Sequence, residues 1–347
     1  MKVRFFLPLA GLAALTGCVL SPMEEERLTV YQQNAQFYYD RGRYVNAEQQ
    51  AKQALLLDEG NEKANLILAW SYLKQNERQK LRMARAQFQE CLGFWFTDQD
   101  YEYKCYLGLG LTCQALGQLV RRDIEDIDRA LADPSAPIGE DEAERLRERR
   151  EDKVDALADL FEESEGAFVE TLDRNPDNPQ ALNGLSQVYV LQGRYDDAIA
   201  RLERYLRLAE DSREYWERRL EVGHLSIDTE RELRDKVDGS FQKEESVRDM
   251  LSNIHYERGD YDLALAEVER CIQIAPDEPR YHITLSQCLE KLGRTREAVD
   301  SVERYLAHPQ VSYETARRLG VYDRLERLRE LAGMSVTEPD SIATDRR

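Results

Sequence analysis

The chain has 347 residues, of which 67 are acidic and 48 are basic, so its formal net charge is −19. Hydrophobic residues make up 42% of the chain, which is enough apolar material to bury a core and excludes wholesale disorder. The 33% of charged residues excludes a polytopic membrane protein. The acid excess argues against nucleic acid as a partner, because phosphate binding needs surplus lysine and arginine.

Residues 1–17 predict a signal peptide, because two basic residues are followed by an apolar run that is too short to span a membrane. The run ends in Leu15-Thr16-Gly17-Cys18. This segment resembles the lipobox of bacterial lipoproteins. The resemblance implies cleavage before Cys18, a diacylglycerol thioether on its sulfur, and usually a third acyl chain such as palmitate on the new amine. The alternative is a plain cleaved signal followed by a chance cysteine.

Val19 follows the cysteine, whereas lipoproteins retained in the inner membrane often carry aspartate there. The resemblance therefore implies a lipid-anchored protein of the cell envelope, at the outer membrane and facing the periplasm. Residues 18–26 form a short lipidated tether. The lipid on Cys18 is then the predicted contact with the membrane.

Four later segments share the pattern Gly-x-(Tyr/Thr)-x-x-Ala and begin at Gly42, Gly193, Gly259 and Gly293. We expect each glycine to end one helix in a left-handed conformation and each alanine to let a second helix approach closely. The last two glycines are 34 residues apart. That period and those residues resemble the tetratricopeptide repeat, a helix–turn–helix unit. The tryptophan common at the fourth repeat position is missing, and Tyr31, Leu182, Arg248 and His282 stand there.

The predicted fold is all-α: a tetratricopeptide-type helical-hairpin solenoid, interrupted by a long helical hairpin and by extra helices. Its predicted parts are an N-terminal repeat array at 27–117, an inserted long hairpin completing a repeat at 118–176, a repeat at 177–211, inserted helices at 212–245, two repeats at 246–310, a capping helix at 311–332 and a mobile tail at 333–347.

The long hairpin should begin after a first helix that ends near Gly117, and its second helix should run over about 140–174. Its outward positions are mostly charged, so it acts either as a solvated prop for the array or as a projecting arm that touches a partner. Gly108 and Gly110 lie within a helical pattern and lack the third glycine of a nucleotide-binding loop. Close helix packing explains them better.

No catalytic motif is found. The four histidines, at 224, 255, 282 and 308, form no paired metal-binding motif, and no phosphate-binding loop or nucleophile elbow occurs. We therefore expect a protein that is not an enzyme, without cofactor, metal or small-molecule substrate. The alternative is a lipoprotein enzyme, or an accessory subunit of a cell-envelope enzyme or secretion complex, with a site in the inserted regions 118–174 or 212–245.

Cys91 and Cys105 are the candidate disulfide, because they lie symmetrically about a predicted turn at Asp98 on adjacent antiparallel helices. The alternative is that they, like the other cysteines of the body, are buried as small hydrophobic residues.

Tetratricopeptide arrays bind peptides or helices on the concave face of their first helices, and the resemblance implies the same here. The predicted groove positions are Gln32, Gln36, Tyr39, Trp70, Asn183, Gln187, Asn253, Tyr256 and Gln287. Carboxamides donate to and accept from a peptide backbone, and aromatic rings add contact area. The alternative is that these are ordinary solvated positions. The predicted function is a non-catalytic scaffold or assembly factor that binds other proteins or peptides at the membrane. A pilotin-like role, help with outer-membrane protein insertion and an adaptor role for cell-wall enzymes stay open.

Overall fold

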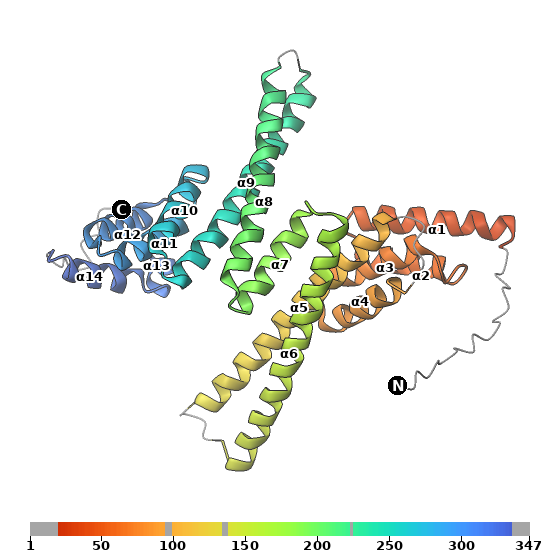
Figure 1. Cartoon of the computed structure of the whole chain (residues 1–347), viewed down its shortest axis with the longest axis horizontal. Coiled ribbons are helices and arrows are strands. Elements are labelled where there is room, and N and C mark those ends of the chain that lie inside the picture. Colours follow the sequence, from red (N-terminus) through yellow and green to blue (C-terminus); the bar gives the residue numbers. More distant parts are fainter. Residues whose placement is uncertain (1–19, 94–98, 134–137, 223–224, 335–347) are drawn as a thin grey trace, which may run out of the picture. The chain divides into compact units, whose positions relative to one another are not determined.

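The computed structural model describes residues 20–93, 99–133, 138–222 and 225–334, and these residues form helices and turns without strands (Figure 1). The signal peptide, Cys18 and the tail 335–347 lie outside the described residues. The chain divides into two compact units, at residues 1–167 and 168–347, and the division falls inside one helix. Each unit is described by itself.

The first unit stacks helices in chain order. Its helices are α1 (Pro22–Asp40), α2 (Tyr44–Leu55), α3 (Glu62–Gln75), α4 (Arg78–Cys91), α5 (Gln99–Ala132) and most of α6 (Glu140–Arg174). Each helix from α1 to α4 packs on the next, and α3 also packs on both α1 and α5, so these three helices form one layer. The core between the layers includes Ala35, Tyr72, Leu81, Phe88 and Leu109.

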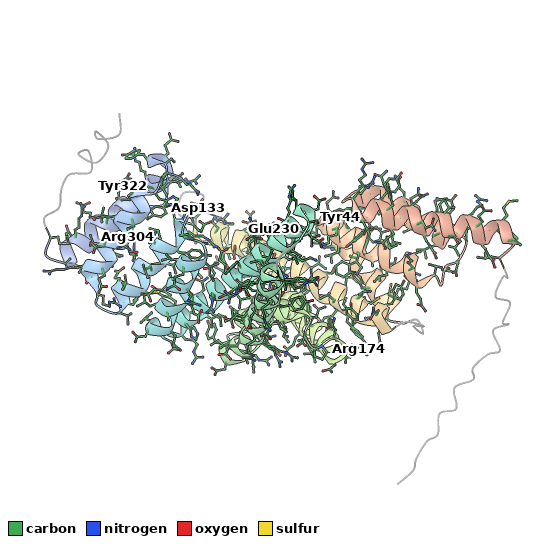
Figure 2. All side chains as sticks on the ribbon, turned by 90° about the horizontal axis from the view of Figure 1, so that it is seen from above. Tyr44, Asp133, Arg174, Glu230, Arg304 and Tyr322 are labelled. Carbon is green, nitrogen blue, oxygen red and sulfur yellow. The ribbon has the colours of Figure 1, made fainter. Side chains whose placement is uncertain are left out.

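The second unit repeats this arrangement. Its helices after the end of α6 are α7 (Pro179–Leu191), α8 (Tyr195–Glu221), α9 (Ile227–Arg258), α10 (Tyr261–Ile274), α11 (Arg280–Lys291), α12 (Thr295–Ala307), α13 (Tyr313–Arg318) and α14 (Val321–Leu331). Each helix from α7 to α11 packs on the next, and α14 packs on α12. Nitrogen and oxygen atoms of side chains lie along the outer surfaces of the helices (Figure 2). Within the described parts of the chain, no helix is both long and apolar enough to cross a membrane.

The predicted glycine turns are confirmed. Gly42, Gly193, Gly259 and Gly293 have φ angles of 70°, 73°, 85° and 74°, which is the left-handed region that favours glycine. After each glycine, the next amide donates to a carbonyl five residues earlier, as Arg294 N does to Leu289 O at 2.9 Å. The alanines of the four motifs have no exposed surface, so the second helix lies close against its neighbours.

Two further glycines each make room for a ring. A Cβ on Gly108 would lie 2.1 Å from Phe88 Cζ, and one on Gly184 would lie 2.3 Å from Phe168 Cζ. Both rings are fully buried. Close helix packing therefore accounts for Gly108, as predicted, and the same contact recurs in the second unit.

The prediction that a helix ends near Gly117 is wrong. The helix α5 continues through this residue. A Cβ there would lie 3.1 Å from Phe161 Cε1, so the glycine lets α6 approach α5 closely. Lys153 Nζ donates to Asp123 Oδ2 at 2.6 Å and Ser164 Oγ donates to Gly110 O at 2.9 Å, so later residues of α6 meet earlier residues of α5 and the two helices run antiparallel. The helix α6 spans Glu140–Arg174, the range predicted for the second helix of the hairpin.

The structure differs from the sequence prediction at two other places. The sequence predicts separate extra helices over 212–245, but these residues are the end of α8 and the start of α9, which lengthen two repeat helices and pack along each other (Figure 1). The single capping helix predicted at 311–332 is two helices, α13 and α14. They are separated because Gly320 adopts a φ of 66°.

Candidate partner-binding site

In the first unit, the carboxamides predicted to line a groove have polar partners within the chain. Gln32 Nε2 donates to Asn61 Oδ1 at 2.7 Å, and Gln36 Nε2 donates to Asp40 Oδ1 at 2.7 Å. Each amide uses one N–H donor in this way, and its carbonyl oxygen can still accept a hydrogen bond. The two α1 side chains are therefore held in defined orientations.

The three predicted groove aromatics share one arrangement: each packs edge to face against an aromatic ring of the second helix in its own hairpin. The ring centroids are 5.6 Å apart for Tyr39–Tyr44, 5.7 Å for Trp70–Phe88 and 5.3 Å for Tyr256–Tyr261. Burial raises the pKa of Tyr39 to about 12, so this phenol stays protonated at neutral pH. One face of each ring is committed to the hairpin, which leaves a rigid aromatic surface at the first helix.

In the second unit, the predicted groove residues are polar and partly solvated. Gln187 Nε2 donates to Asn183 Oδ1 at 3.2 Å on α7, and Asn253 Nδ2 donates to Asp249 O at 2.9 Å on α9. Gln287 lies half-buried on α11. The predicted positions thus lie on α1 and α3 of the first unit and on α7, α9 and α11 of the second, and their role in binding stays a prediction.

The cysteine pair also stays a prediction. Cys91, Cys105 and Cys113 are free, buried thiols in the first unit, as are Cys271 and Cys288 in the second. A hydrogen bond with Cys91 and burial raise the pKa of Cys105 well above its ordinary value, so the two sulfurs are neighbours. That proximity suits the predicted disulfide, while the thiol state suits the alternative of small buried hydrophobic residues.

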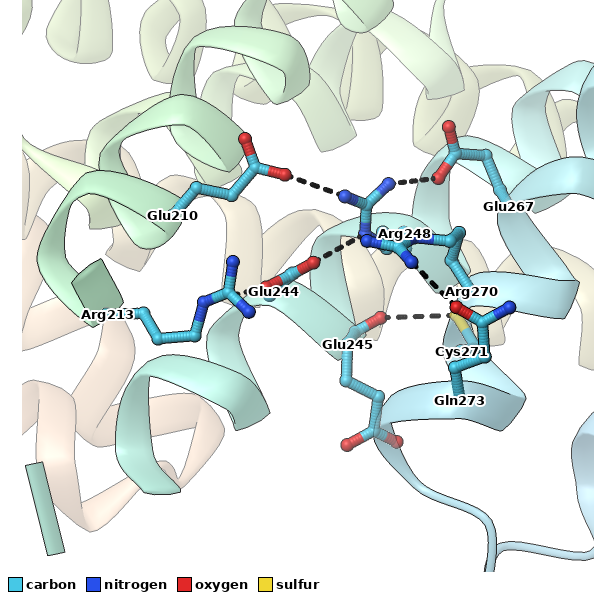
Figure 3. Close-up of polar contacts among 9 residues, drawn as sticks. All are labelled: Glu210, Arg213, Glu244, Glu245, Arg248, Glu267, Arg270, Cys271 and Gln273. Atoms are coloured by element: carbon cyan, nitrogen blue, oxygen red, sulfur yellow. Dashed lines mark hydrogen bonds and ion pairs between the residues drawn. The ribbon is translucent and has the colours of Figure 1, made fainter. Parts of the chain in front are cut away.

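A buried ion network, which sequence reasoning missed, joins three helices of the second unit (Figure 3). The Arg248 guanidinium on α9 donates through Nε to Glu244 Oε1 at 2.9 Å, through Nη1 to Glu267 Oε2 at 2.9 Å and through Nη2 to Glu210 Oε1 at 2.7 Å. Arg248 is 7% exposed and Glu244 only 1%. In the sequence, one feature points to this network: Arg248 occupies the repeat position where tryptophan is common, next to the buried Val247.

The network holds α8, α9 and α10 together. Burial alone would lower the pKa of Arg248, but its carboxylate partners raise it overall, so the guanidinium stays charged. Removing one member of such a buried network leaves an uncompensated charge and costs about 3–5 kcal/mol. This part of the second unit is consequently fixed by charge as well as by apolar packing.

Beside this network lies a cavity of about 470 Å³, which we call the α9 cavity. Its lining includes Arg213 of α8, the residues Asp238, Phe241, Glu244 and Glu245 of α9, and Ile274 of α10. Glu244 Oε2 is buried without a hydrogen-bond donor among the described residues. Arg213 Nε lies 3.6 Å from it, which is an ion pair but too long for a hydrogen bond. Over the residues that the structure describes, no group of histidine, cysteine or carboxylate side chains is placed to hold a metal ion.

In a comparison with known proteins, residues 157–219 and 255–318 match the model of the tetratricopeptide repeat family. A tetratricopeptide repeat protein from Parabacteroides merdae is 12% identical, covering 92% of this chain and 97% of its own, with a TM-score of 0.45. A thermophilic one from Thermus thermophilus is 18% identical, covering 77% and 98%, with a TM-score of 0.39. The structure of pilF from Pseudomonas aeruginosa is 12% identical, covering 93% and 100%, with a TM-score of 0.30. No curated protein matches the chain.

Proposed function

Because the chain contains tetratricopeptide repeats folded as stacked helical hairpins, we propose that it is a non-catalytic scaffold that binds other proteins. The repeat match is the observation that carries this proposal. Repeats of this kind stack into extended surfaces, and such surfaces serve binding. In each unit by itself, the proposed binding face is formed by the first helices of the hairpins, which are α1 and α3 in the first unit and α7, α9 and α11 in the second.

The chemistry of that face supports an extended peptide or a helix as the ligand. Half-buried rings such as Tyr39 and Trp70 offer contact area at little cost in side-chain entropy, because each is already held by a second ring. Oriented carboxamides such as Gln32 can accept hydrogen bonds from a peptide backbone.

We further propose that the scaffold is held at the membrane by acyl chains on Cys18, at the outer membrane and facing the periplasm. The lipobox-like Leu15-Thr16-Gly17-Cys18 supports this proposal. Several acyl chains on one residue anchor a protein durably, where one chain gives only marginal binding. The net charge of −19 would weaken any direct attraction to anionic lipid, so the acyl chains carry the attachment. A role in assembling an envelope complex follows from that position.

The enzyme alternative would need a site in one of the two insertions, and each holds a cavity. A cavity of about 720 Å³ at the start of α6 is lined by charged residues such as Glu140 and Arg145, together with Leu146. The α9 cavity contains carboxylates, but Glu244 already accepts from Arg248, and Glu245 accepts from the Tyr281 hydroxyl at 2.5 Å. Both carboxylates are engaged in structural contacts, and we therefore favour binding over acid–base chemistry.

Site-specific photocrosslinking in cells tests the scaffold function. A photoreactive residue at Asn253, exposed on the first-helix face of α9, should capture a partner protein. The matched control is Ala266, exposed on the second helix α10, which should capture little. Capture of no protein at Asn253 or at Gln36, or equal capture at Ala266, would contradict binding on the first-helix face.

Membrane fractionation tests the anchor separately. The Cys18→Ser variant loses the thiol that would be acylated, so we expect it to move from the membrane fraction to the soluble fraction. Cys288→Ser, at a buried position of α11, is the control that should leave the distribution unchanged. Unchanged sedimentation of Cys18→Ser would overturn the lipid anchor while leaving the scaffold proposal in place.

A further inference from the structure

We propose that the α9 cavity receives one basic side chain, a lysine or an arginine, from a protein that docks on this unit. This inference rests on the proposed scaffold function and adds a second point of contact to it. The cavity is lined by residues 238–245 of α9 together with residues of α8 and α10, and none of the predicted groove positions is among them. The cavity would therefore recognise a basic side chain of the partner that the predicted groove does not contact.

The charge of the lining favours a cation. Three carboxylates, those of Asp238, Glu244 and Glu245, face the cavity together with two guanidinium groups, those of Arg213 and Arg270. The Arg270 guanidinium also donates through Nη1 to Gln273 Oε1 at 2.6 Å, which orients it but leaves its charge in place. Among the side chains that line the cavity, carboxylates outnumber guanidinium groups by three to two. Glu244 and Glu245 are also paired with Arg248 and Arg280 from outside the lining, which leaves Asp238 as the carboxylate whose charge the lining does not balance.

Glu244 gives the cavity an acceptor that lacks a donor. Its Oε1 is bound by Arg248, but its Oε2 is buried and receives no hydrogen bond among the described residues. A buried acceptor without a donor is costly, and a hydrogen bond to a charged group is worth more than one between neutral groups. An ammonium or guanidinium group carries several N–H donors and a positive charge, so it can both donate a hydrogen bond to Glu244 Oε2 and balance the charge of the carboxylate.

Arg213 is the side chain placed to give way. It lies at 3.6 Å from Glu244 Oε2, its side chain is 27% exposed, and its guanidinium carbon lies 5.0 Å from the centre of the Phe241 ring. It thus balances the charge of Glu244 without making the hydrogen bond. An incoming guanidinium that takes this place keeps the charge balanced, while Arg213 can move outward to solvent.

Size and apolar lining agree with an inserted side chain. A volume of about 470 Å³ admits a long side chain but not a helix. The half-buried Phe241 and Ile274 offer apolar surface on which the methylene groups of lysine or arginine can lie. The ligand is therefore expected to insert end-on, with its charged head toward Glu244.

Methyl NMR on the full chain can test the site with a defined probe. The probe is the blocked pentapeptide acetyl-Ala-Ala-Arg-Ala-Ala-amide, and its control replaces arginine by the neutral isostere citrulline. We expect the arginine peptide to shift the methyl signals of Ile274 and Ala275, which line the cavity, and the citrulline peptide to leave them in place. Absence of shifts with the arginine peptide, or equal shifts with both peptides, would overturn the proposal.

Two variants test which carboxylates of the cavity bind the arginine peptide. Glu244→Gln removes the buried carboxylate and should weaken the arginine peptide about tenfold. If that variant does not fold, Asp238→Asn at the exposed rim gives the same test with a smaller loss, about threefold. Glu269→Gln, on the exposed face of α10 and outside the lining, is the control that should keep the affinity. Equal affinity in Asp238→Asn, Glu269→Gln and the parent chain would contradict a cation site.

The outcomes separate this inference from the scaffold function. Arginine-peptide binding without any protein crosslinked at Asn253 would leave the cavity site standing and remove the scaffold. Crosslinking at Asn253 without arginine-peptide shifts at Ile274 would leave the scaffold and overturn the cavity site.

Discussion

The contact between Gly184 and Phe168 allows a sharp test of how the second unit is packed. A Cβ added to Gly184 would lie 2.3, 2.7 and 2.8 Å from three atoms of the Phe168 ring. Carbon atoms rest at about 3.5–4.0 Å, so the ring would have to withdraw by about 1 Å. Phe168 has no exposed surface, and a close-packed interior offers it no space to do so.

The expected effect is the difference of two opposing contributions. Overpacking of this kind costs about 1–3 kcal/mol, whereas replacing glycine by alanine within a helix gains about 1 kcal/mol. Gly184→Ala should therefore lower the free energy of unfolding by up to about 2 kcal/mol. Gly239→Ala is the matched control, because it lies within α9 and a Cβ there meets nothing within 4 Å. This control should instead stabilise the unit by about 0.5–1 kcal/mol.

Thermal or guanidinium unfolding followed by circular dichroism gives the comparison. Repeat proteins do not always unfold in one step, so the transition of the second unit should be compared between variants at equal conditions. Adding Phe168→Leu should rescue Gly184→Ala, because the smaller side chain removes the ring atoms that clash. A Gly184→Ala midpoint at or above that of Gly239→Ala would refute the close approach of α7 to the ring.

Two further predictions concern a buried carboxylate and a helix contact. Burial would raise the pKa of Glu48, but hydrogen bonds from Lys52, Lys80 and Gln75 lower it to about 2. Its stabilisation is therefore complete above the unfolded pKa near 4.5 and lost as pH falls toward 2, by about 3 kcal/mol, and Glu48→Gln should abolish that slope in denaturation at several pH values. Ala264→Arg, at a position with no exposed surface, should destabilise the α9–α10 pair by a few kcal/mol. An unmoved melting curve would contradict the pairing.

The turns can be predicted from sequence because a single residue type marks them. A glycine at the end of a helix, followed by a small residue in the next helix, predicts a left-handed turn and a close helix pair. Gly259 and Ala264 follow this rule, because Gly259 has a positive φ and Ala264 is fully buried. Glycine within a helix carries the opposite meaning. The pattern around Gly117 predicts a helix end, yet a ring on another helix occupies the space that its missing side chain leaves. Sequence spacing does not tell these two uses apart, because the second depends on a residue far along the chain.

The candidate site is less completely predictable. Groove positions follow from the repeat register, so residues such as Tyr39 and Asn253 can be selected in advance. Two of the rings that the groove aromatics meet, Tyr44 and Tyr261, belong to the Gly-x-(Tyr/Thr)-x-x-Ala pattern, but the pattern does not tell which ring each of them contacts. The Arg248 network is hidden because its carboxylates come from three helices, and with 67 acidic residues in the chain no pair of charges stands out.

Because both units contain buried cysteines, the reactivity of these thiols can report on local opening in each unit separately. Burial raises the pKa of Cys271 to about 12 and that of Cys288 to about 11, and the pKa of Cys113 in the first unit is also raised above its usual range. An alkylating reagent attacks the thiolate, so in the reduced protein these sulfurs react only when the surrounding helices open. The rate at which a reagent alkylates each cysteine therefore measures how often the helices around it open. No added label is needed, because each unit has its own cysteines.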